Sequence, residues 1–87
     1  MNSIEHFING KIVKGLSKRT AKVFNPATGD VSSNVNLANT EDIDKAVNAA
    51  KKAFPAWSEK TPLFRARILF KFKELIEKNY DELTKII

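Results

Sequence analysis

Phe24-Asn25-Pro26-Ala27-Thr28-Gly29-Asp30 is the stretch of sequence around which the fold is organised. Pro26 sets the backbone angle for the second position of a turn, and the Asn25 side chain can accept a hydrogen bond from the backbone that follows it. Gly29 is placed where a left-handed residue closes the corner. The stretch therefore predicts a sharp turn over residues 25–30.

Strand patterns lie on both sides of this turn. Residues 20–24 are β-prone, and apolar and polar residues alternate over 31–37, as in a half-buried strand. Nearer the N-terminus, Asn9-Gly10 lies between apolar residues, which is a strong hairpin signal because a type I′ turn needs a positive φ at both positions. We therefore expect β hairpins within residues 1–38, arranged as a meander over 5–38.

The remaining residues, 40–87, have helical patterns. Thr40 is expected to cap a first helix whose first turn is acidic, and Pro55 is expected to end it because proline has no amide proton. Thr61 and Pro62 open a second helix, with a capping residue followed by proline at the first helical position. Strands followed by helices predict an α/β fold.

A third helix is expected near the end of the chain. Asn79 breaks the second helix, and Glu82 lies three residues later, as in a capping box. The apolar stripe of this helix runs to Ile87 without a glycine or proline stop signal. On the second helix, Phe70 points almost opposite to Phe72, so both faces of this helix need to be covered. We expect a truncated chain; the alternative is a short terminal helix that docks on the core.

The composition excludes several kinds of site. The 87 residues include no cysteine and one histidine, His6, which leaves no disulfide, thiolate ligand or cysteine nucleophile. The glycines at 10, 15 and 29 cannot form a G-x-G-x-x-G motif or a P-loop. His6, beside Glu5, is expected at the surface. We predict no catalytic, cofactor-binding or metal-binding residue within 1–87.

The formal net charge of +5 raises the question of nucleic-acid binding. Basic residues over 65–78 spread around the expected helix and are interrupted by Glu74 and Glu77, which favours a solvated face. Trp57 is expected to seal a core rather than to stack on a base. No apolar run approaches the ~18 residues of a membrane span, and the first residues lack a signal-peptide pattern. We expect a cytoplasmic protein without a nucleic-acid or membrane partner.

Five sequence blocks follow one another along the chain. They are Phe7-Ile8-Asn9-Gly10-Lys11, Phe24-Asn25-Pro26-Ala27-Thr28-Gly29-Asp30, Asp42-Ile43-Asp44-Lys45-Ala46-Val47, Ala53-Phe54-Pro55-Ala56-Trp57-Ser58, and Arg65-Ala66-Arg67-Ile68-Leu69 running into Glu74-Leu75-Ile76-Glu77. Each block alone is unspecific. In this order and at these spacings they resemble the amino terminus of the aldehyde dehydrogenase superfamily, over essentially the whole chain.

The resemblance implies the amino-terminal part of an aldehyde dehydrogenase fold, within the NAD-binding domain of a longer, tetrameric enzyme. In such enzymes a cysteine attacks the aldehyde, hydride passes to NAD, and CoA or water resolves the thioester. The residues for these steps lie further along the family's chain, so none is carried onto positions 1–87. The implied partners are the remainder of the chain, other copies of it and a small aldehyde.

Residues 65–75, with the Phe-Lys-Phe-Lys run at 70–73, look most like the CoA-acylating methylmalonate-semialdehyde dehydrogenases. This likeness implies conversion of malonate or methylmalonate semialdehyde to acetyl- or propionyl-CoA in valine catabolism, by the full-length protein and not by this piece alone. Two alternatives stay open: another NAD(P)-dependent aldehyde dehydrogenase that releases a free acid, and a free-standing, non-catalytic interaction module.

Overall fold

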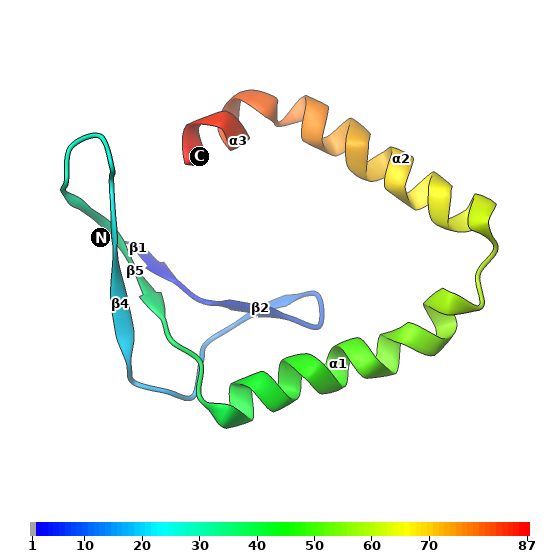
Figure 1. Ribbon diagram of the computed structural model, residues 1–87, viewed down its shortest axis with the longest axis horizontal. Coiled ribbons are helices and arrows are strands. Elements are labelled where there is room, and N and C mark those ends of the chain that lie inside the picture. The colour runs from blue at the N-terminus through cyan, green and yellow to red at the C-terminus, as the bar shows by residue number, and fades with distance from the viewer. Residues whose placement is uncertain (1) are drawn as a thin grey trace. The chain divides into compact units, whose positions relative to one another are not determined.

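The computed structural model describes residues 2–87, which form five strands followed by three helices (Figure 1). The elements are β1 (Asn2–Ile4), β2 (His6–Ile8), β3 (Lys11–Val13), β4 (Thr20–Phe24), β5 (Val31–Asn36), α1 (Thr40–Ser58), α2 (Pro62–Lys78) and α3 (Tyr80–Ile86). The α/β class and the order of strands before helices are confirmed. The chain divides into two compact units, one reaching to Ala53 and the other spanning Phe54–Ile87.

The strands form two sheets instead of one continuous meander. β2 and β3 make the predicted hairpin, in which Asn9 and Gly10 have φ values of 55° and 75°, as a type I′ turn requires. The second sheet has the order β1-β5-β4, with β4 antiparallel and β1 parallel to the central β5. The meander expected over 5–38 was wrong because β3 and β4, although consecutive in the chain, belong to different sheets and do not pair. The pairing of β1 with β5 joins segments too far apart to leave a local sequence signal.

The turn between β4 and β5 has the predicted conformation. The Asn25 amide donates to the Asp30 carbonyl at 2.7 Å, and the Gly29 amide donates to the Asn25 carbonyl at 2.7 Å. The Asn25 side chain accepts a hydrogen bond from the Ala27 amide at 2.9 Å, and Gly29 has a φ of 78°. The turn therefore brings β4 and β5 together as neighbouring antiparallel strands.

Asn39, rather than Thr40, caps the N-terminus of α1. The Asn39 carbonyl accepts from the Ile43 amide at 3.1 Å, and Asn39 Oδ1 accepts from the Asp42 amide at 2.9 Å. The prediction of Thr40 as the cap was one residue off. Both residue types can cap a helix. Asn39 is favoured as the cap because the side chains of Asn39 and Asp42 each accept a hydrogen bond from the backbone amide of the other residue.

Pro55 does not end α1, which continues to Ser58. A proline in the last turn removes one amide donor from the helix, but its carbonyl still accepts. Here the Pro55 carbonyl accepts from the Glu59 amide at 3.2 Å and from Ser58 Oγ at 2.9 Å. The predicted end was therefore three residues too early.

The start of α2 was predicted correctly, and the start of α3 only in part. Thr61 Oγ1 accepts from the Phe64 amide at 3.1 Å, with Pro62 as the first residue of α2. Asn79 separates α2 from α3 as expected. However, Asn79 Nδ2 donates back to the Leu75 carbonyl at 2.8 Å, and Asn79 makes no side-chain cap bond to α3. The capping box with Glu82 is therefore not formed, because the Asn79 side chain is used to satisfy the end of α2.

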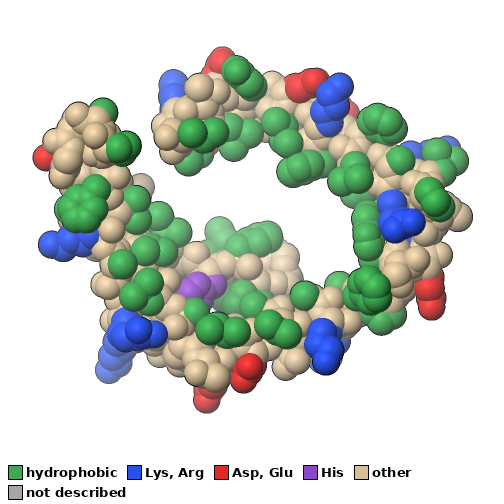
Figure 2. Space-filling model, viewed as in Figure 1, with side chains coloured by type: hydrophobic (Ala, Val, Ile, Leu, Met, Phe, Trp, Pro, Cys, Tyr) green, Lys and Arg blue, Asp and Glu red, His purple; other side chains and the backbone are tan. Residues whose placement is uncertain are grey.

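Large hydrophobic side chains lie at the surface along the described chain (Figure 2), and no hydrophobic residue among 2–87 is buried. Phe70 and Phe72 are 69% and 60% exposed. Trp57 lies inside α1 and is 39% exposed, so it does not seal a core among the described residues. Within residues 2–87, none of the helices has the length and apolar character needed to cross a membrane.

Candidate functional site

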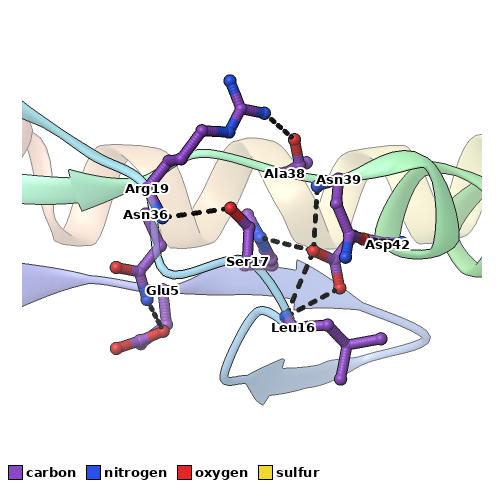
Figure 3. A network of polar contacts seen from close by, with 9 residues as sticks. Glu5, Leu16, Ser17, Arg19, Asn36, Ala38, Asn39 and Asp42 are labelled. Carbon is purple, nitrogen blue, oxygen red and sulfur yellow. Dashed lines mark hydrogen bonds and ion pairs between the residues drawn. The ribbon is translucent and has the colours of Figure 1, made fainter.

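The clearest side-chain cluster in the structure surrounds Asp42, which is only 4% exposed (Figure 3). Both carboxylate oxygens of Asp42 accept from the Leu16 amide, each at 3.2 Å. Asp42 Oδ2 also accepts from the Asn39 amide at 3.1 Å. The carboxylate therefore connects the loop between β3 and β4 to the first turn of α1.

The charged form of Asp42 is favoured by its surroundings. The hydrogen bond from the Asn39 amide lowers the pKa of Asp42 most, and the Leu16 amide, His6 and Lys45 lower it further, against the opposing effect of burial. The N-terminal turn of a helix also favours a negative charge. Asp42 is therefore a carboxylate at neutral pH.

His6 lies beside this carboxylate and not at the surface. Its side chain is 16% exposed, and its Nε2 lies 3.7 Å from Asp42 Oδ2, too far for a hydrogen bond. Nε2 is buried and has no hydrogen-bond partner among the described residues. The surface position expected for His6 was wrong. The pairing of β2 with β3 places the imidazole against Gly15, in the loop that follows β3.

Gly15 makes this close approach possible. A Cβ atom at position 15 would lie 2.6 Å from His6 Nε2 and 3.4 Å from Asp42 Oδ2. Any other residue would push the imidazole or the carboxylate away from its present place. We define the Asp42 cluster as His6, Gly15, Leu16, Asn39 and Asp42.

Further polar contacts surround the Asp42 cluster (Figure 3). Arg19 Nη2 donates to the Ala38 carbonyl at 3.0 Å, and the Leu37 amide donates to the Arg19 carbonyl at 2.9 Å. Asn36 Nδ2 donates to the Glu5 carboxylate. The first two bonds join the connection between β5 and α1 to the loop after β3. The third joins the end of β5 to the residue between β1 and β2.

The contacts of the Asp42 cluster that the structure describes are hydrogen bonds between side chains and backbone amides. Ser17 Oγ, in the loop after β3, accepts from the Arg19 amide. Among residues 2–87, no three His, Asp or Glu side chains are grouped so that they could hold a metal ion. The cluster orients the backbone around the first turn of α1.

The three glycines of the chain lie in turns or beside a side chain. Gly10 and Gly29 lie in turns between antiparallel strands, and Gly15 packs against His6. The N-terminus of α1 already holds the Asp42 carboxylate, which would repel a phosphate there.

Sequence patterns contained part of this site. The Asn39-x-x-Asp42 spacing is itself a capping pattern and could have located the start of α1. No comparable signal indicates that His6 and Leu16 meet Asp42, because those contacts join residues far apart in the sequence.

Comparison with known proteins identifies the family. Residues 12–87 match the family model described as the aldehyde dehydrogenase family. Malonate-semialdehyde dehydrogenase of Pseudomonas aeruginosa is 42% identical over 87 residues, and its counterpart in Halalkalibacterium halodurans is 44% identical over 85 residues. These alignments cover 100% and 97% of this chain, but the chain spans only 17% of the length of either relative.

The solved structures agree. A protein assigned as a methylmalonate-semialdehyde dehydrogenase of Sinorhizobium meliloti 1021, complexed with NAD, matches 98% of this chain with a TM-score of 0.93 and 45% identity. Methylmalonate-semialdehyde dehydrogenase of Oceanimonas doudoroffii matches 94% with a TM-score of 0.87 and 46% identity. This chain covers 17% of each of those chains. The five strands and three helices are thus the amino-terminal part of a known fold, and the chain belongs to the aldehyde dehydrogenase family.

Proposed function

We propose that this chain is a scaffold part of an NAD-dependent enzyme that converts malonate or methylmalonate semialdehyde to acetyl- or propionyl-CoA, in the cytoplasm and within valine catabolism. The observation that carries the proposal is the agreement of sequence and structure comparisons. Relatives and structures named for these two semialdehydes match 94–100% of the chain at 42–46% identity. The S. meliloti protein was solved with NAD.

Within such an enzyme, residues 1–87 support the NAD-binding domain and supply no catalytic, cofactor-binding or metal-binding side chain. The hydrogen bonds of the Asp42 cluster, which orient backbone, support this role. The exposed apolar side chains of α2 support it as well, because helices with such surfaces normally pack against further polypeptide. We propose that the partners are the remainder of the enzyme chain and the other copies of that chain in a homotetramer.

The Phe-Lys-Phe-Lys run at residues 70–73 indicates which enzymes the chain is related to, but it does not itself select the substrate. Lys71 lies 3.5 Å from Glu74, Lys73 lies 3.5 Å from Glu77, and all four side chains are largely exposed. Such i,i+3 and i,i+4 pairs are ordinary features of a solvated helix face. Lys71→Ala should therefore leave the dependence on CoA unchanged.

A second candidate is an aldehyde dehydrogenase that releases a free acid. An aldehyde dehydrogenase from Bartonella henselae matches 98% of the chain with a TM-score of 0.92, at 32% identity. The backbone of this region is therefore shared with a relative whose name specifies no semialdehyde. The higher identity to the semialdehyde dehydrogenases favours the first candidate.

The deciding experiment uses the protein in the longest form in which its gene is expressed. Methylmalonate semialdehyde and malonate semialdehyde are supplied with NAD, with and without CoA, and both NADH and the acyl product are measured. We expect CoA-dependent turnover and a thioester product. Equal NADH formation without CoA, with free acid as the only product, would identify the second candidate. Absence of any aldehyde oxidation would instead favour a non-catalytic interaction module.

A further inference from the structure

We propose that the Asp42 cluster is a charge-dependent link, which holds β2 and the β3–β4 loop to the N-terminus of α1 while Asp42 is ionised and releases them when Asp42 is protonated. The proposal concerns a conformational device of this chain and does not depend on which aldehyde the enzyme oxidises.

The first support is the position of the link in the strand-bearing unit. The β2–β3 hairpin and α1 face each other across open hollows lined by Phe7, Ile8, Ala46, Ala49 and Ala53. Small alanine side chains cannot reach across such a space to fill it. The Asp42 carboxylate, by contrast, bonds the Leu16 amide directly across 26 residues of sequence. The Asp42 carboxylate therefore bonds the loop after the hairpin directly to the first turn of α1, next to the bonds between Arg19 and residues 37 and 38.

The second support is the number of donors that meet one carboxylate. Leu16 offers its amide to both oxygens, Asn39 offers its amide to one of them, and the His6 ring lies next to it. Protonation places a hydrogen on one oxygen and removes the negative charge, which makes the carboxyl group a weaker acceptor for these N–H groups. The protonated form therefore bonds the Leu16 and Asn39 amides more weakly.

The third support is that the surroundings of Asp42 favour its ionised form. The hydrogen bond from the Asn39 amide lowers the pKa of Asp42 most, and the Leu16 amide, His6 on β2 and Lys45 on α1 lower it further, against the opposing effect of burial. The nearby Arg19 guanidinium is bonded to the Ala38 carbonyl, and the Glu5 carboxylate accepts from Asn36, so neither bonds Asp42. No described acidic side chain is bonded within the cluster to oppose the charge.

The direction of the pH dependence follows from this lowered pKa. A carboxyl group whose pKa is lower in the folded state contributes its full stabilisation above the pKa it has in the unfolded chain. That contribution is lost as the pH falls through the lowered pKa of Asp42. The link is therefore complete at neutral pH and opens only under acid conditions.

The test is hydrogen exchange measured by mass spectrometry on the protein in the longest form in which its gene is expressed. Asp42→Asn replaces the carboxylate by an uncharged group of the same shape, as protonation does. Asp44→Asn is the matched control, because Asp44 is on the same helix, two residues later, and is exposed. We expect a several-fold loss of protection in Asp42→Asn for peptides containing Leu16 and Asn39, with other peptides unchanged, and no such loss in Asp44→Asn.

The wild-type protein supplies a second measurement if Asp42→Asn does not fold. Protection factors, corrected for intrinsic exchange, are followed for the same peptides from neutral to acid pH. We expect selective loss in the Leu16 and Asn39 peptides before the rest of the protein opens. Unchanged protection in Asp42→Asn, an equal loss in Asp44→Asn, or a wild-type profile in which these peptides open only together with all others would each overturn the proposal.

Discussion

The unit that reaches to Ala53 and the unit Phe54–Ile87 are held by interactions of different range. In the first unit, side chains bond groups far away in sequence: Leu16 with Asp42, Arg19 with Ala38, and Asn36 with Glu5, at separations of 26, 19 and 31 residues. In the second, the side-chain hydrogen bonds found among the described residues span three or four positions. Local bonds define helices, but they do not hold one helix against another element.

Burial follows the same division. The first unit contains both buried polar residues, Ser33 and Asp42, whereas α2 and α3 contain no buried residue. Most of the stability of a protein helix comes from packing of its apolar face rather than from its intrinsic propensity. Among the described residues, the helical unit therefore has less packing to stabilise it than the strand-bearing unit has.

The largest expected effect is on the isolated 87-residue chain. Because its apolar side chains are exposed, including Phe70 and Ile86, we expect a loosely packed species that binds a hydrophobic dye strongly and unfolds without a sharp transition. Circular dichroism during heating and dye fluorescence provide the measurement. A sharp, cooperative thermal transition of the monomer would show that the helical unit needs no additional partner.

The same isolated chain should not bind NAD appreciably or oxidise aldehydes. The reasons are the absence of cysteine and the placement of its glycines in turns or against His6. Calorimetric titration measures the first property, and NADH formation the second. Micromolar binding of NAD would contradict the assignment of these residues to a scaffold.

Gly15→Ala should destabilise the strand-bearing unit, because the His6 ring must move to make room for the new methyl group. The new methyl group would lie 2.6 Å from His6 Nε2, and overpacking of this kind typically costs about 1–3 kcal/mol. Denaturant unfolding of the expressed protein gives the free energy. In a double-mutant cycle, His6→Ala should relieve part of the cost, since the two sites are in contact. Additive effects would mean that the contact does not limit residue 15.

Gly29→Val should destabilise the protein by a different mechanism. No atom lies within 4 Å of the position that a Cβ would take at residue 29, so the cost comes from the φ of 78° alone, about 1–2 kcal/mol. Gly29→Asn is the matched control and should cost less, because asparagine tolerates the left-handed region. The effect should appear in folding yield. A selective rise in the Michaelis constant for NAD, with stability unchanged, would place the turn at the cofactor site.

Thr61→Ala should have the smallest effect of the series. It removes the hydrogen bond from the Phe64 amide to the Thr61 hydroxyl, and loss of such a cap costs about 1 kcal/mol. Thr84→Ala, which removes a bond to the Tyr80 carbonyl inside α3, is the control and should cost less. Equal losses in thermal unfolding would show that the cap does not define the start of α2.

Short-range features were predictable because the residues that decide them are neighbours. Asn9-Gly10, the turn after Phe24, and the Thr61-Pro62 start of α2 all have the expected form. The errors at Thr40 and Pro55 have the same local nature. At the start of α1 two residues that can cap a helix are adjacent, and Asn39 is the one whose side chain bonds a backbone amide. At Pro55 the carbonyl still accepts from the Glu59 amide, so the helix continues to Ser58.

The sequence by itself determined the order of strands and helices, the tight turns and the bounds of α2, since each depends on residues within about one helical turn. The sequence also identified the family, because five sequence blocks follow one another in the family's order. Only the tertiary structure decided that β1 pairs in parallel with β5 and that His6 and Leu16 meet Asp42. Those contacts join chain segments that are far apart in the sequence. The sequence around each of these residues does not indicate which residue it will contact.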